Sequence, residues 1–447
     1  ILLGDPSGRG AVIESSNPDL GDWTTNYAVI NVKGGVQDPN LFVDDDGKVY
    51  LYEESSNKWP IHGIELDAEN YYIPMGEQVD LFNLNPDKYG WERFGQDHTS
   101  DLKPFIEGPW MVKHKDTYYL EYGAPGTQWN VYADGVYTSK NPLGPFEYAP
   151  YNPISYKPGG FLKGAGHGST VKDNNGNYWH YSTMAISVNF KFERRLGMYP
   201  AGFEENGQMY VNTAYGDYPH YLPNSSIEKH KERFTGWMLL SYNKPVKTNS
   251  GLVTKEVNVV DESADGYMQE QITDFNISKI NDEEIRSYWV SEANNDSIFV
   301  EIDLLKPMKI KALQINFQDF NSEVFGRPKD LKQQFIIEGS LDGKKWNVIA
   351  DYSKNERDMP HAYIELKNGN EAKPATPNNF KVVRQKDRRN TNLTWDAVKN
   401  ATGYVIYWGI AKDKLNLSAL MYNKPNYELR ALTTDQKYYY QVEAFNE

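Results

Sequence analysis

The chain has 447 residues, a formal net charge of −14 and no cysteine. This length predicts two or three domains with ample hydrophobic core. The acidic balance excludes a typical nucleic-acid binder, because phosphate contacts need a basic face and basic runs such as 384–389 are short. The absence of cysteine excludes disulfides, thiolate metal sites and a cysteine nucleophile. The negative net charge also leads us to expect a neutral or cationic partner.

No apolar run reaches the roughly 20 residues that a membrane-spanning helix needs. The first residues, Ile1-Leu2-Leu3, have neither the length nor the basic flank of a signal peptide. We expect a secreted, periplasmic or cell-surface protein whose export signal lies outside this chain, and the oligomeric state stays open.

The chain contains 33 tyrosines and 11 tryptophans, and stretches with helical periodicity are scarce. Aromatic and β-branched residues favour strands. We therefore predict an all-β protein, with flat rings suited either to stacking on sugars or to filling the cores between sheets.

Two segments, 36–52 and 106–120, share one layout. In each, an acid is followed by a proline that can start a strand. A strand of alternating apolar residues, a tight turn and an aromatic return strand come next. Asp38 and Glu107 hold the equivalent position at the mouth of each hairpin, so the two acids can converge on one pocket. Further copies of the turn and aromatic strand favour propeller blades with loop insertions. An ordinary β-sandwich with coincidental turn chemistry is the alternative.

The chain divides into three predicted domains. Residues 1–242 carry the hairpin repeats of the predicted propeller. Residues 252–368 alternate short strands with polar turns, as β-sandwiches do. A proline-rich joint precedes residues 374–447, where period-two strands predict a second, smaller sandwich.

The two C-terminal domains resemble known modules. Residues 374–447 resemble a fibronectin type III domain with Trp395 as its core tryptophan. Residues 252–368 resemble a discoidin domain, through Tyr288-Trp289 before a first core strand and through 338–346, and such domains often bind carbohydrate or lipid at one end. Both the first blade and the discoidin-like domain look incomplete, so we expect residues to be missing near 7–11 and 367–368.

Three motifs in the first domain carry a further resemblance. The segments 38–47, 107–110 and 166–169 look like those of glycoside hydrolase family 43, and they occur in the family's order. The resemblance implies a five-bladed β-propeller enzyme that cleaves arabinosyl, xylosyl or galactosyl linkages with inversion.

Inversion needs a protonated carboxyl for the leaving oxygen and an ionised one to activate water, about 6.5–9.5 Å apart. By resemblance, Glu107 is the general acid and Asp38 orients it and tunes its pKa. The family's general base is an Asp in a first-blade Asp-Pro motif, which Asp5 matches. Asp5 as an ordinary turn residue is the alternative.

The resemblance also implies binding residues. His167 would lie on the propeller axis near a bound calcium ion or water, and because calcium prefers oxygen ligands, His167 would act at its periphery or through water. Arg195 would reach the substrate. Trp110 and Trp129 would either stack on a sugar or fill blade cores. No organic cofactor is expected.

We therefore expect an inverting glycoside hydrolase, exo-acting because the loops 57–73 and 122–135 look long enough to close one end of the pocket. It would release arabinofuranosyl, xylosyl or galactosyl units from plant or algal polysaccharide. The main alternative is a catalytically silent carbohydrate-binding propeller on a cell surface. A third is an adhesion protein built on the two C-terminal modules.

Overall fold

The computed structural model spans the chain and describes most of it. The described residues are 2–3, 12–26, 30, 32–185, 194–215, 225–226, 239–252, 260–262, 268–270, 275–285, 287–317, 330–366, 375–399, 401, 403–422 and 424–445. Asp5 and the expected gaps near 7–11 and 367–368 lie outside them. In the described parts of the chain, no helix is long and apolar enough to cross a membrane.

The prediction of an all-β protein is confirmed. Over the described ranges, every helix is a 3-10 turn of three or four residues, and strands supply the rest of the regular structure. The turns are η1 (Pro18–Leu20), η2 (Gly90–Glu92), η3 (Gln96–His98), η4 (Thr213–Tyr215) and η5 (Ile277–Ile280).

The chain forms two compact units. The first comprises Ile1–Ala185, Arg194–Gly236 and Ala375–Phe445, and the second comprises Ile186–Glu193, Trp237–Pro374 and Asn446–Glu447. The C-terminal strands therefore belong to the same unit as the N-terminal sheets, although a whole strand-rich segment separates them in the sequence.

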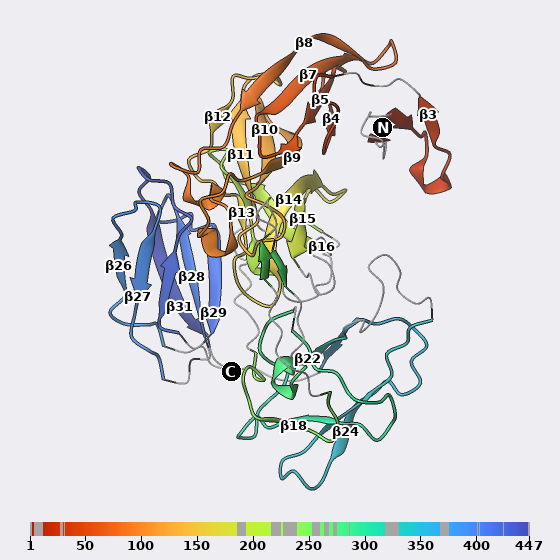
Figure 1. Ribbon diagram of the computed structural model, residues 1–447, viewed down its shortest axis with the longest axis vertical. Helices are drawn as coiled ribbons and strands as arrows, with labels where there is room; N and C mark the ends of the chain where they lie inside the picture. The colour runs from red at the N-terminus through yellow and green to blue at the C-terminus, as the bar shows by residue number, and fades with distance from the viewer. Residues whose placement is uncertain are drawn as a thin grey trace. The chain divides into compact units, whose positions relative to one another are not determined.

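The N-terminal part of the first unit contains successive antiparallel sheets built mainly from strands that follow one another along the chain (Figure 1). This up-and-down pattern is that of propeller blades. The first sheet joins β1 (Leu2–Leu3), β2 (Val12–Glu14) and β3 (Thr24–Asn26). The second joins β4 (Asn40–Val43), β5 (Val49–Glu53), β7 (Ile61–Asp67) and β8 (Ile73–Phe82).

Two further sheets follow. The third joins β6 (Ser55–Ser56), β9 (Ile106–His114), β10 (Thr117–Ala124), β11 (Ala133–Ser139), β12 (Glu147–Tyr148) and β13 (Ser155–Tyr156). The fourth joins β14 (Lys163–Lys172), β15 (Tyr178–Ala185), β16 (Arg194–Phe203) and β17 (Met209–Val211).

The predicted turn chemistry forms the hairpin between β4 and β5. Gly47 adopts a left-handed φ of 84° and its N–H donates to the carbonyl of Asp44 at 2.9 Å. Glycine meets little steric cost there. The return strand β5 is buried along its whole length because β4 and β7 flank it on both sides.

Many of the abundant aromatic residues fill the spaces between sheets. Phe82 of β8 stacks on Tyr137 of β11 with ring centroids 3.9 Å apart, and Tyr122 tilts against both rings. Trp91 lies beside Tyr122 and is completely buried. These rings pack the second sheet against the third.

Glu92 lies buried in this aromatic core. The Tyr122 hydroxyl donates to Glu92 Oε1 at 2.7 Å. Burial raises the pKa of Glu92 to about 8, against its ordinary value of 4.5, although this hydrogen bond and one from the Asn85 N–H oppose the shift. Because the folded state then holds a proton that the unfolded state releases, the free energy of unfolding should fall as the pH rises from about 4.5 to about 8.

We expect Glu92→Gln to remove this component of the pH dependence, whose limiting slope is about 1.4 kcal/mol for each pH unit. The measurement is urea unfolding of both proteins at pH 5, 6.5 and 8. The difference in stability between variant and wild type should change steadily in favour of the variant over that range. A constant difference would show that Glu92 titrates at its ordinary pKa.

The C-terminal residues of the first unit form two three-stranded sheets, drawn in blue in Figure 1. Trp395, which follows β27, is buried and packs edge-to-face on Tyr404 of β28 with centroids 5.1 Å apart. One sheet joins β26 (Lys381–Arg384), β27 (Thr391–Thr394) and β30 (Asn426–Leu429), and the other joins β29 (Leu417–Tyr422), β28 (Gly403–Gly409) and β31 (Tyr439–Phe445).

The second unit consists, over its described residues, of paired strands joined by turns. The pairs are β18 (Val246–Thr248) with β21 (Val300–Ile302), β19 (Val260–Glu262) with β20 (Met268–Glu270), β22 (Ala312–Asn316) with β25 (His361–Glu365), and β23 (Ile336–Gly339) with β24 (Asn347–Asp351).

Candidate active site

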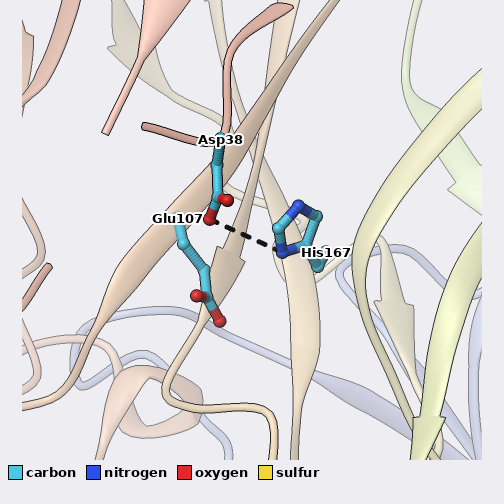
Figure 2. Close-up of side chains that lie close together, drawn as sticks. All are labelled: Asp38, Glu107 and His167. Atoms are coloured by element: carbon cyan, nitrogen blue, oxygen red, sulfur yellow. Dashed lines mark ion pairs between the residues drawn. The ribbon is translucent and has the colours of Figure 1, made fainter. Parts of the chain in front are cut away.

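Three of the residues singled out from the sequence meet in space: Asp38, Glu107 and His167 (Figure 2). Asp38 precedes β4, Glu107 is the second residue of β9, and His167 lies in β14. Their side-chain ligand atoms lie within 4.8 Å of one another, and His167 Nδ1 is 3.9 Å from Asp38 Oδ2. The side chains of Asp38 and His167 are 30% and 32% exposed, so a ligand in solvent can reach them.

The backbone at this site departs from regular strand geometry. Asp38 and His167 have left-handed φ values of 44° and 53°, which non-glycine residues rarely adopt. The pairing of β10 with β9 shifts register opposite Glu107, and the pairing of β14 with β15 shifts register around His167. Such bulges and strained residues redirect side chains and cluster at functional sites.

Glycine next to Glu107 permits the close approach of the two motifs. A Cβ atom on Gly108 would lie 2.5 Å from Cδ2 of His167, and one on Gly166 would lie 2.7 Å from Cγ of Tyr132. Both distances are too short for real carbon contacts. The glycines of the two motifs therefore let Glu107 and the His167 ring share one pocket.

Two residues that the sequence did not single out contact the Glu107 carboxyl group. The Tyr132 hydroxyl donates a short hydrogen bond to Oε1, and the Ser55 hydroxyl donates to Oε2 at 3.3 Å. Tyr132 is fully buried, and burial, reinforced by the charge of Glu107, raises its pKa well above the ordinary value. Its hydroxyl therefore stays protonated and acts as a donor. Nothing in the sequence distinguishes Tyr132 from the other tyrosines.

A buried polar cluster lies beneath the site. His180 Nε2 pairs with Asp134 Oδ2 at 2.8 Å, and His180 Nδ1 pairs with Glu121 Oε2 at 3.2 Å. The Thr170 hydroxyl donates to the same Glu121 oxygen at 3.0 Å. Burial opposes charge on the imidazole, but the hydrogen bonds and charges of Asp134 and Glu121 outweigh it and raise the pKa of His180 to about 9. This cluster could not be predicted from the sequence, because its members lie on different strands.

This cluster explains the glycine that follows His167. A Cβ atom on Gly168 would lie 2.2 Å from His180 Nε2 and 2.5 Å from Asp134 Oδ2. The buried ion pair therefore packs directly against the Gly168 backbone. It supports the strand that carries His167.

The remaining predicted residues occupy different environments. Arg195 is exposed and lines a pocket of about 280 Å³ with His167, Thr183 and Leu196. Trp110 is half-buried, and its indole N–H donates to the carbonyl of Thr170 at 2.9 Å.

Trp129 is only 5% exposed, and its ring packs edge-on against Phe94 with centroids 5.3 Å apart. It lies in the core behind the site. Asp5, the predicted base, lies outside the described residues.

Asp38, Glu107 and His167 are also the residues that could hold a metal ion in the described part of the chain. They offer two carboxylates and one imidazole. Calcium takes about six to eight oxygen ligands. The three side chains therefore fit a divalent cation only if water or other groups complete its shell.

Comparison with known proteins agrees with the motif resemblance. A sequence profile described as "Glycosyl hydrolases family 43" matches residues 4–209. The chain is 31% identical over 205 residues to a "Xylosidase/arabinosidase" from Butyrivibrio fibrisolvens, covering 43% of this chain and 36% of that protein. It is 26% identical over 153 residues to "Beta-D-galactofuranosidase xynD" from Aspergillus niger, covering 33% of this chain and 38% of that protein.

The chain thus spans little more than a third of the length of these curated relatives. Among solved structures it is similar to a thermostable family-43 glycoside hydrolase, with a TM-score of 0.41 and 23% identity over 49% of this chain and 70% of that one. The matched segment contains Asp38, Glu107 and His167. Residues 4–209 are thus similar in sequence to glycosyl hydrolase family 43.

Proposed function

We propose that the protein is an inverting, exo-acting glycoside hydrolase with Glu107 as its general acid. The observation that carries this proposal is the convergence of Glu107, Asp38 and His167 on one partly exposed site within the segment that matches the family. A carboxyl group at such a position can protonate a glycosidic oxygen.

The contacts of Glu107 suit this role. Tyr132 and Ser55 fix its two oxygens, so the carboxyl group has one orientation toward the pocket. Asp38, whose carboxylate lies in the same cluster, would orient Glu107 and tune its pKa. Asp5 is the proposed base, on the strength of its Asp-Pro motif alone, and it would activate the water that attacks from the opposite face of the sugar.

The proposed substrates are arabinofuranosyl, xylosyl and galactosyl units at the ends of plant or algal polysaccharide. The names of the relatives, a xylosidase/arabinosidase and a β-D-galactofuranosidase, lie within this range. Arg195 and His167 line the pocket and would donate hydrogen bonds to sugar hydroxyls. Trp110 would offer an apolar ring on which a sugar could stack.

We also propose a three-domain architecture. The N-terminal domain, 1–242, would be a five-bladed propeller, with a discoidin-like domain at 252–368 and a fibronectin type III-like domain at 374–447. A calcium ion would bind near His167 through water and have a structural role. The protein would work outside the cytoplasm.

The test is a panel of aryl α-L-arabinofuranosides, β-D-xylosides and galactosides, followed by the matching oligosaccharides. We expect hydrolysis of at least one aryl glycoside, and a monosaccharide as the only initial product from the oligosaccharide. Longer initial products would show endo action. Binding of the oligosaccharides without hydrolysis of any substrate would support the silent carbohydrate-binding alternative.

A further inference from the structure

The C-terminal sandwich, residues 375–445, makes backbone contacts with a segment that leads toward the general acid. The Gly90 N–H donates to the carbonyl of Leu432 at 3.0 Å, and the Thr434 N–H donates to the carbonyl of Lys88 at 3.0 Å. These bonds join the two parts of the first unit by main chain. A flexible tether would not need them.

Arg93 anchors this contact. Its guanidinium donates to Asn390 Oδ1 at 2.7 Å and to the carbonyl of Arg430, and it pairs with Asp387 Oδ2 at 3.4 Å. The Arg93 side chain is only 12% exposed. Its Nε also donates to the carbonyl of Gly90 at 3.2 Å, within its own segment. The other partners of this largely buried guanidinium lie in the sandwich, so its position depends in large part on the sandwich.

The segment after Arg93 pairs with the loop that precedes β11, residues 125–132, here called the acid-support loop. The Asp97 N–H donates to Asn130 Oδ1 at 3.0 Å, and the Asn130 amide donates to Asp97 Oδ1 at 2.8 Å. His98 Nδ1 lies 2.9 Å from the carbonyl of Arg93, which ties the segment to its anchor.

The acid-support loop ends at Tyr132, the residue whose hydroxyl contacts Glu107. Asn130, two positions earlier, is buried and also donates to the carbonyl of Pro158 at 2.9 Å. Hydrogen bonds and short stretches of main chain therefore link the sandwich, through Arg93, Asp97 and Asn130, to Tyr132 and Glu107.

We propose that the C-terminal sandwich is a structural part of the catalytic site, and that Arg93 and Asn130 are positioning residues for the carboxyl group of Glu107. This inference rests on the proposed role of Glu107 as the general acid. It assigns residues 375–445 a function that a polymer-binding or spacer module would not have.

Rates of hydrolysis of small soluble substrates distinguish the two roles. A module that only binds polymer raises the effective concentration of its substrate, so it leaves rates on small soluble glycosides unchanged. A module that positions the acid affects those rates, because small displacements of a catalytic group cost up to about 10²-fold. The loss of rate should be largest for substrates whose leaving group needs a proton.

The test compares Arg93→Ala with Arg388→Ala, which removes an exposed arginine of the sandwich. Each full-length variant is assayed on a 4-nitrophenyl glycoside and on an unactivated oligosaccharide of the same sugar. We expect Arg93→Ala and Asn130→Ala to lower kcat on the oligosaccharide about 10-fold more than on the aryl glycoside. Arg388→Ala should match the wild type on both.

The ratio of the two rates does not depend on the fraction of folded protein. Equal losses on both substrates, or no loss, would therefore overturn the inference. Hydrogen exchange provides a readout that needs no activity: in Arg93→Ala, amides of residues 126–132 should lose protection relative to Arg388→Ala, and unchanged protection would also overturn it. If the wild type hydrolyses nothing, the proposed function fails, while the exchange result still decides whether the sandwich supports the loop.

Discussion

Glu107→Ala should lower the rate on unactivated glycosidic linkages by about 10² to 10⁴, the usual contribution of a general acid. An aryl glycoside with a good leaving group needs little protonation, so it should keep much more of its rate. The measurement is kcat/KM on a series of aryl glycosides whose leaving groups span a range of acidity, together with an oligosaccharide.

The matched control is Glu147→Ala, which removes an exposed glutamate from β12 of the same sheet. It should leave every rate unchanged. If Glu107→Ala loses the same factor on all leaving groups, Glu107 does not donate the proton.

Gly168→Ala should cause the largest loss of stability among single methyl additions to the site. The new Cβ would force apart the buried pair of His180 and Asp134, which lie 2.2 Å and 2.5 Å from its position. Breaking a buried ion pair costs about 3–5 kcal/mol. The measurement is the free energy of unfolding in urea.

Gly47→Ala is the control, because its Cβ would meet no atom within 4 Å and only its left-handed φ of 84° is strained. That strain costs about 1–2 kcal/mol. Equal losses in the two variants would mean that the His180 cluster shifts freely, and that it does not support the strand of His167.

The sequence was most informative where local chemistry repeats. Asp38 and Glu107 hold equivalent positions at two hairpins, which predicted that the two acids converge. In the structure, one carboxylate oxygen of each acid lies within 4.8 Å of the other. The glycines at 108 and 168 were also visible as parts of motifs, although their packing partners were not.

Contacts between distant segments could not be predicted in this way. Ser55 lies in β6, Tyr132 in the loop before β11, and His180 in β15 beneath the site. Serine, tyrosine and histidine occur at many other positions of this chain, so their residue types alone did not mark them as neighbours of the site. The sequence also favoured a linker-joined module at 374–447, whereas 375–445 shares a compact unit with the N-terminal sheets. Charged residues such as Arg93 and Asp387 suggest solvent exposure until their partners are known.

The stereochemistry of the reaction tests the proposed mechanism most directly. Proton NMR of the first sugar released from a reactive glycoside, recorded before mutarotation, identifies its anomeric configuration. An acid and a base that act on opposite faces of the sugar predict a product of inverted configuration. A product of retained configuration would require a covalent intermediate, and it would contradict the role of a general base assigned to Asp5.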